Sequence, residues 1–289
     1  MLCAGFTIVK NAVRYGYPVK ESILSALPLC DVFYVLIGDC DDGTEALIRS
    51  INSDKIIIHH SVWDHTVNTN GEVLALETNK AMAMIPDTYS WLLYLQADEA
   101  LHENDYACIR EAMQLHTNNH RVDGLLFSYH HFWGSFSYVG TTSKWYRREI
   151  RIVKNRKDIF SYRDAQGFRK KPNQKLQVVL LDAHVYHYGW VRPPAKMQEK
   201  YAGVQQYWSN ENKYIPQQSE FDYSQIDDLA EFTGTHPALM QTMVNNQLWE
   251  FSYDASRTKM RFKEKIKRVL FQLTGYRFFE YKNYRIISS

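Results

Sequence analysis

The sequence predicts an α/β fold: a three-layer sandwich with a mostly parallel central sheet, an added antiparallel portion and C-terminal helices. Hydrophobic residues make up 45% of the 289 positions and aromatic residues 14%, a composition that excludes a disordered chain. In the first half, short apolar runs alternate with segments of helical periodicity. In the second half, β-type runs follow one another without a Pro/Gly/Ser linker, so we expect them to extend the same sheet.

Short apolar runs in the first half predict four strands, at residues 4–9, 31–37, 55–59 and 91–95. The second run, DVFYVLI, is continuously apolar, as is typical of a strand covered on both faces in a parallel sheet. Helical spacing, in places with a closing proline, predicts helices at residues 17–27, 45–51, 72–85 and 103–115. Thr44 is the expected N-cap of the second helix. Strands and helices at this spacing form right-handed βαβ units.

The second half has a different pattern. Apolar and β-branched runs predict strands at residues 122–132, 150–154 and 175–188. A helix is expected over 193–208, followed by a polar stretch to about residue 228 and then more helix.

Acidic clusters at residues 39–42 and 98–99 follow two of the predicted parallel strands. Ligands of such sheets bind beyond the carboxyl ends of the strands, although an acidic turn can also be a solvated loop. The sequence has no G-x-x-x-x-G-K-[ST] loop, no G-x-G-x-x-G after the first strand and no G-x-S-x-G elbow. Carboxylates without a glycine-rich phosphate loop indicate that Mg²⁺ or Mn²⁺ binds the phosphates, with Asp98 as the best candidate ligand.

Three segments in order resemble the family 2 glycosyltransferases of the GT-A fold: TIVKN at residues 7–11, IGDCDDGT at 37–44 and WLLYLQADE at 91–99. The similarity in order and spacing covers roughly residues 4–190. It implies a single GT-A-like catalytic domain over residues 1–256, with a nucleotide-binding half to about residue 120 and an acceptor half from 121. It also implies a nucleotide-diphosphate sugar as the donor.

The resemblance assigns roles to individual positions. Asn11 and Asp39 would lie along the nucleoside, and Asp98 matches the last acid of the D-x-D motif, which binds the metal. Gln96 stands where the family has the first Asp, which removes one negative charge and leaves an amide for ribose or phosphate. Lys80 would supply the positive charge that an Arg often supplies in the preceding helix.

Two later positions fit the same pattern. His187 resembles the family's late histidine, which completes the metal or diphosphate site; a structural role among aromatic residues is the alternative. His184 is three residues earlier on the same predicted strand and should face the other side of the sheet. Asp164 is the candidate general base of an inverting transfer, or else an aspartate paired with Arg163 or Arg169 in a loop.

The formal charge of +2 is divided unevenly along the chain. Residues 257–289 contain ten Lys or Arg against two Glu, a net charge of +8, which leaves −6 for residues 1–256. Apolar residues of this basic tail lie at helical spacing, at Phe262, Ile266, Val269, Leu270 and Leu273. A basic amphipathic helix is typical of a membrane-surface element, and the alternative is a stripe that packs on the body. The acidic body disfavours nucleic acid as a partner.

The sequence therefore predicts a glycosyltransferase that moves a sugar from a nucleotide-diphosphate donor to a glycan or other cell-envelope acceptor, including a lipid-linked one. Two alternatives stay open: a sugar nucleotidyltransferase, and a catalytically silent carbohydrate-binding or scaffold protein on the same fold. No apolar run approaches the ~20 residues of a membrane span, and the N-terminal apolar stretch lacks a basic region. We expect a cytoplasmic protein, with peripheral contact at the inner face of the membrane through the tail.

Overall fold

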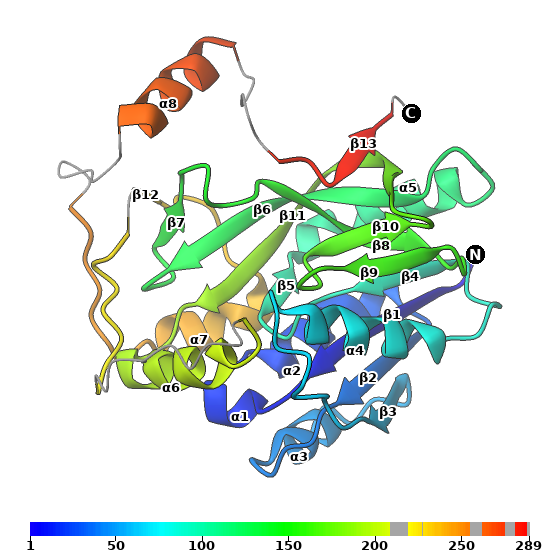
Figure 1. Ribbon diagram of the computed structural model, residues 1–289, viewed down its shortest axis with the longest axis horizontal. Helices are drawn as coiled ribbons and strands as arrows, with labels where there is room; N and C mark the ends of the chain where they lie inside the picture. The colour runs from blue at the N-terminus through cyan, green and yellow to red at the C-terminus, as the bar shows by residue number, and fades with distance from the viewer. Residues whose placement is uncertain (209–218, 227, 255–261, 275–280, 288–289) are drawn as a thin grey trace.

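The computed structural model describes residues 1–289 except 209–218, 227, 255–261, 275–280 and 288–289. The described strands form one curled sheet with helices on both faces (Figure 1). Parts of the expected basic tail, residues 257–261, 275–280 and 288–289, lie outside the described residues.

The first half of the sheet is parallel, as expected. Its strands stand in the order β3-β2-β1-β4, and their bounds are β1 Cys3–Val9, β2 Val32–Ile37, β3 Ile56–His60 and β4 Trp91–Tyr94. Every residue of β1, β2 and β4 is buried, because helices cover both faces of these strands. The apolar runs that predicted these strands therefore reflect burial on two sides.

The sheet continues through β8 Arg148–Lys154, β6 Gly124–Trp133, β11 Gln174–Trp190, β10 Gly167–Lys170 and β9 Ile159–Tyr162. β8 runs antiparallel to both of its neighbours, whereas β6 and β11 are parallel to each other. Four short strands extend this portion: β5 Glu99–Leu101 and β13 Tyr284–Ile286 pair with β11, β7 Tyr138–Gly140 pairs with β6, and β12 Leu229–Glu231 pairs with β7. The two halves share one sheet, which agrees with the absence of a linker in the sequence.

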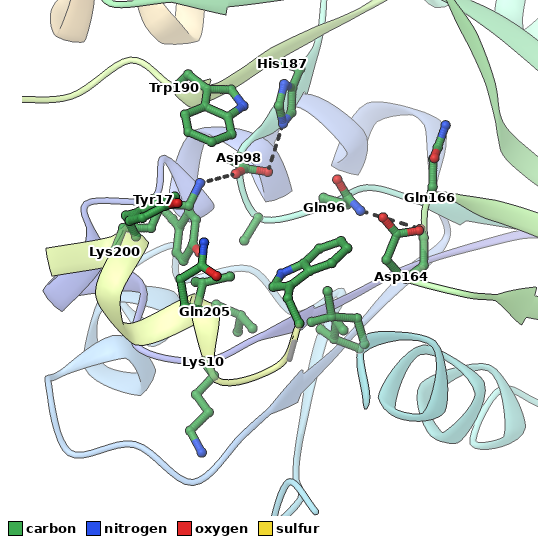
Figure 2. Close-up of a pocket in the computed structure, with 18 of the residues that line it drawn as sticks. Lys10, Tyr17, Gln96, Asp98, Asp164, Gln166, His187, Trp190, Lys200 and Gln205 are labelled. Atoms are coloured by element: carbon green, nitrogen blue, oxygen red, sulfur yellow. Dashed lines mark hydrogen bonds and ion pairs between the residues drawn. The ribbon is translucent and has the colours of Figure 1, made fainter. Parts of the chain in front are cut away.

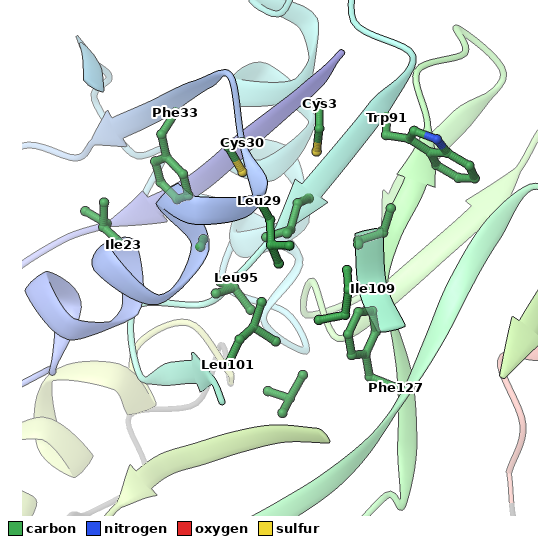
Figure 3. Packing of buried hydrophobic residues seen from close by; sticks show 14 of the residues in the cluster. Cys3, Ile23, Leu29, Cys30, Phe33, Trp91, Leu95, Leu101, Ile109 and Phe127 are labelled. Carbon is green, nitrogen blue, oxygen red and sulfur yellow. The ribbon is translucent and has the colours of Figure 1, made fainter. Parts of the chain in front are cut away.

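The helices form the outer layers. Their bounds are α1 Ala12–Tyr15, α2 Val19–Ala26, α3 Thr44–Arg49, α4 Glu72–Ala83, α5 Tyr106–His116, α6 Pro194–Gln205, α7 Gln241–Asn245 and α8 Phe262–Thr274. Apolar residues of α2, α3 and α5 pack on one face of the sheet with Phe33, Trp91 and Phe127 (Figure 3). Apolar residues of α4 pack on the other face with Phe6 and Tyr94. This is the GT-A-like three-layer arrangement that the resemblance implies.

Two of the differences from the sequence-based expectations have a clear local cause. The N-cap of α3 is Gly43, in the left-handed conformation with φ 84°, so the prediction of Thr44 as the cap is wrong. Thr44 is already helical, and Asp42 accepts hydrogen bonds from its backbone nitrogen and its hydroxyl. The hairpin β9–β10 was not expected, because its short strands mix polar and aromatic residues without a clear alternation.

None of the helices in the described part of the chain combines the length and apolar character needed to span a bilayer. The last described strand, β13, returns the tail to the sheet beside β11. α8 precedes β13 in the chain, and Figure 1 shows it standing away from the sheet.

Candidate functional site

A cavity of about 440 Å³ opens at the carboxyl ends of β1 and β4. This is the position that ligands take in open α/β sheets. Helix α6 closes one side of the cavity, and the β9–β10 hairpin closes another. The lining comprises Ile8, Val9, Lys10, Tyr17, Trp63, Leu74, Tyr94, Gln96, Ala97, Asp98, Tyr146, Asp164, Ala165, Gln166, His187, Trp190, Met197, Lys200, Tyr201, Val204, Gln205 and Trp208. Four of the seven site residues predicted from sequence are among them: Gln96, Asp98, Asp164 and His187.

Asp98 lies between two nitrogen-bearing side chains (Figure 2). Its Oδ2 accepts from Lys200 Nζ at 3.2 Å, and its Oδ1 is 3.8 Å from His187 Nε2. Burial works against ionisation of Asp98, yet the positive charge of Lys200 lowers the pKa of its carboxyl to about 2. The carboxylate is therefore charged at neutral pH, as a ligand for a cation must be.

Lys200 and Arg192 are site residues that sequence reasoning missed. Lys200 reaches the cavity from α6 and also donates to the carbonyl oxygen of Gly189 at 2.7 Å. Arg192 follows β11 by two residues and is 2% exposed. Both cations stand over the ring of Tyr17, with Lys200 Nζ at 4.9 Å and the Arg192 guanidinium at 5.1 Å from its centroid. Burial, followed by the nearby Arg192 charge, lowers the pKa of Lys200 to about 7.

The hydrogen bonds of His187 fix its tautomer. Burial lowers the pKa of both His131 and His187, so both rings are neutral at pH 7. The carbonyl of Tyr146 can only accept, so His131 Nε2 donates to it at 2.8 Å and His131 Nδ1 carries no proton. His187 Nδ1 must then donate to His131 Nδ1 at 3.1 Å. The lone pair of His187 Nε2 is consequently free on the side of Asp98.

A carboxylate and a neutral imidazole 3.8 Å apart fit a shared divalent ion, because each would bond at about 2.0–2.2 Å. No group of three or more His, Cys, Asp or Glu at metal-binding distances occurs among the described residues, so such an ion would have two protein ligands. Substrate phosphates and water commonly supply the remaining ligands of such ions. Gly189 makes room for this pair, since a Cβ there would lie 2.5 Å from His187 Nε2 and 2.9 Å from Asp98 Oδ2.

Asp164 reaches the cavity from the turn of the β9–β10 hairpin. Its neighbours Arg163 and Ala165 both have positive φ, 57° and 58°, an uncommon conformation for residues other than glycine. The turn thereby directs Asp164 toward Gln96, as Figure 2 shows. Arg163 stacks over Tyr162 instead of pairing with Asp164. Burial raises the pKa of Asp164, which makes its carboxylate a stronger base.

A buried ion pair supports the floor of the site. Arg151 donates from Nε and Nη2 to Glu99 at 2.8 and 2.7 Å, and both side chains are fully buried. Arg151 Nη1 also donates to the carbonyl of Gln166 at 2.7 Å, while Glu99 accepts from the backbone nitrogen of Gln96 at 3.1 Å. This pair therefore joins the loop that carries Asp98 to the hairpin that carries the candidate base.

The other predicted site residues lie outside the lining of the cavity. Asp39 is at its edge, where it accepts from Lys10 Nζ at 2.7 Å and from the Trp63 backbone at 3.1 Å. Asn11 is buried at the start of α1 with φ 55°. Lys80 pairs at 2.6 Å with Glu77, one turn away on α4, and is not part of the cavity lining. His184 faces the opposite side of the sheet, as predicted, stacked on His130.

No protein-family model and no curated protein matches the sequence. Solved structures show partial likeness. Two chains of S. aureus TarS share 11% identity, with TM-scores of 0.37 and 0.39; each comparison covers 71% of this chain, and 39% and 64% of the TarS chains. Glucosyl-3-phosphoglycerate synthase from Mycobacterium tuberculosis, solved with Mn²⁺ and UDP, shares 13% identity, with a TM-score of 0.29 over 46% of this chain and 43% of that chain.

A synthase of 4-diphosphocytidyl-2C-methyl-D-erythritol shares 10% identity, with a TM-score of 0.34 over 53% of this chain and 75% of that chain. The chain thus spans less than two thirds of either TarS chain. At these low values, the case for a function lies in the residues of the cavity.

Proposed function

We propose that the protein is an inverting glycosyltransferase that moves a sugar from a nucleotide-diphosphate donor to a glycan or cell-envelope acceptor. One observation carries the proposal. A single cavity contains Asp98 and His187, which fit a cation that binds phosphates, and Asp164, whose carboxylate is paired with no arginine of the described residues. The resemblance of the three sequence segments to family 2 glycosyltransferases supplies the sugar chemistry.

In this mechanism Asp164 accepts the proton of an acceptor hydroxyl, and the hydroxyl oxygen bonds to the anomeric carbon of the donor. The bond between that carbon and the diphosphate oxygen breaks at the same time, and the nucleoside diphosphate leaves with the electron pair. Attack opposite the leaving group inverts the anomeric configuration. Gln96, whose amide is 3.5 Å from the Ala165 carbonyl, lies beside Asp164 and is available to the ribose or a phosphate.

A divalent ion bound by Asp98 and His187 would neutralise the developing charge on the leaving diphosphate. Mn²⁺ matches the mixed oxygen and nitrogen donors better than Mg²⁺ does, since Mg²⁺ takes oxygen ligands almost alone. His131 orients the imidazole, and Lys200 must give up its contact with Asp98 for both carboxylate oxygens to become available.

Calorimetry with UDP-, GDP- and dTDP-sugars, with and without Mn²⁺, tests donor binding, and release of nucleoside diphosphate measures turnover. We expect Asp164→Asn to abolish transfer while donor affinity stays within twofold of the wild type. Unchanged turnover would move the base elsewhere, and the absence of binding to any nucleotide sugar would refute the proposal. Tight binding without turnover in the wild type would favour the silent carbohydrate-binding alternative.

We further propose that α8 docks on an anionic membrane surface that carries the acceptor. Phe262, Val269 and Leu273 are 77%, 53% and 78% exposed, and Ile266 is 44% exposed. Most of the expected apolar stripe therefore does not pack on the body, and only Leu270 of the five is half-buried. An exposed apolar stripe beside lysines on the same helix is the pattern of an interfacial helix.

Co-sedimentation with phosphatidylglycerol vesicles tests this docking. We expect Leu273→Ser to lower vesicle binding at least about tenfold, since a leucine side chain contributes about 1.5–3 kcal/mol when it is removed from water. Leu248→Ser is the matched control, because Leu248 is 94% exposed but lies outside α8. Equal binding of both variants would refute a role for α8. Point variants are preferable to deletion of the tail, which would also remove β13.

A further inference from the structure

The cation cluster at Asp98 has an unbalanced charge. In their ionised forms, Asp98, Lys200 and Arg192 carry one negative and two positive charges. Lys200 is paired with Asp98, but Nε, Nη1 and Nη2 of Arg192 have no hydrogen-bond partner among the described residues. Arg192 is nevertheless 2% exposed. A buried guanidinium without a counter-anion is costly, so the cluster is electrostatically prepared for an anion.

The neighbouring groups restrict where that anion would bind. Arg192 stacks on the ring of Tyr17, and the ammonium of Lys200 lies over the same ring and lines the cavity. Burial lowers the pKa of Arg192 without neutralising it, since a guanidinium keeps its proton in proteins. The positive potential of the cluster therefore reaches the cavity at Lys200, next to the carboxylate that we propose as a metal ligand.

The other lysine that lines the cavity does not offer the same site. Lys10 Nζ is 2.7 Å from Asp39, so its charge is balanced within the protein. Lys200 pairs with Asp98, which is also a ligand of the proposed metal ion. When the ion binds Asp98, the ammonium of Lys200 loses this negative partner and can bind the phosphates of the donor instead.

We propose that Lys200 binds the diphosphate of the donor directly and that Arg192, which stacks on the ring of Tyr17, adds the second charge of this subsite. The subsite binds nucleoside diphosphates even without a divalent ion, because Asp98 balances only one of its two cations. This inference rests on the proposed function for the identity of its ligand. The existence of an anion site built from two cations does not depend on the proposed function.

Calorimetry on the full chain in EDTA tests the subsite, with UDP, GDP, dTDP and inorganic pyrophosphate as probes. We expect Lys200→Gln to weaken binding at least tenfold and Arg192→Gln to weaken it by a similar factor, with partial rescue by Arg192→Lys. Lys196→Gln is the matched control, since Lys196 lies one turn earlier on α6 and pairs with Glu199 at 3.2 Å. We expect its affinity to stay within twofold of the wild type.

Each outcome bears on one of the two proposals. Nucleotide binding in EDTA that Lys200→Gln does not weaken would overturn the subsite, as would binding that occurs only with Mn²⁺; the proposed transferase would survive both results. Pyrophosphate binding that depends on Lys200, without binding of any nucleotide, would support the subsite and refute the nucleotide-sugar function. Equal losses in Lys200→Gln and Lys196→Gln would show a diffuse charge effect and overturn the subsite.

Discussion

Replacement of Arg151 by methionine tests the buried ion pair below the cavity. Arg151 and Glu99 are both fully buried, and two hydrogen bonds of 2.7–2.8 Å join them. Among the described residues, the substitution leaves the Glu99 carboxylate with only the Tyr129 hydroxyl at 2.9 Å and one backbone N–H. Removal of one partner from a buried pair costs about 3–5 kcal/mol, because the remaining charge is uncompensated.

The assay is thermal and urea unfolding of the variant. For 289 residues the unfolding entropy is about 0.6 kcal/mol/K, so we expect the melting temperature to fall by about 5–8 °C. Arg49→Met is the control, since Arg49 pairs with Glu45 on the surface of α3 and is 63% exposed. An exposed pair of this kind contributes less than about 1 kcal/mol.

The double variant Glu99→Gln with Arg151→Met separates charge from packing. It removes both charges, so we expect it to recover most of the stability lost in Arg151→Met. A melting temperature for Arg151→Met within 1–2 °C of the Arg49→Met value would refute the reasoning. Failure of the double variant to recover would assign the loss to the shape of the arginine side chain.

Three further predictions follow from the site. The acid limb of the kcat/KM profile should lie above the ordinary aspartate pKa of about 3.9, because burial raises the pKa of Asp164; a limb at or below that value would contradict its role as base. Burial raises the pKa of Glu149 to about 8, so between pH 5 and 7 the folded state keeps a proton that the unfolded chain releases. The free energy of unfolding should therefore fall as pH rises, by up to about 1.4 kcal/mol per unit, and Glu149→Gln should remove this slope in urea titrations at several pH values. Gly189→Ala should weaken Mn²⁺ binding at least tenfold in calorimetry with circular dichroism unchanged, because its Cβ would displace His187 or Asp98; wild-type affinity would argue against a metal there.

The parallel half of the fold could be predicted closely from the sequence. Strands β1, β2 and β4 are buried on both faces, so successive residues are apolar and the strand is visible in the sequence as an uninterrupted apolar run. The hairpin β9–β10 could not be found in this way. Its strands mix buried and half-buried positions and owe their pairing to tertiary contacts rather than to composition.

The same contrast applies to the site. Asp98 and Gln96 were predicted because they directly follow a recognisable strand. Lys200 and Arg192 were not, since a lysine on a helix and an arginine after a strand usually indicate solvent exposure. Their burial arises only when α6 docks against Tyr17. Lys80 was chosen by position in a family pattern, and a glutamate one turn away engages its charge.

The return of the chain to the sheet at β13 sets a limit on the distance between membrane and sheet. α8 ends at Thr274 and β13 begins at Tyr284, so ten residue steps separate them. A fully extended chain covers at most about 3.6 Å per residue, and β13 cannot lie more than about 36 Å from the end of α8. If α8 lies on a bilayer, this maximum length also limits how far the sheet can stand from the membrane surface. Acceptors whose sugars stand much farther from the lipid than the body can reach would be poor substrates. The length of a membrane-attached glycan would then decide whether it is used.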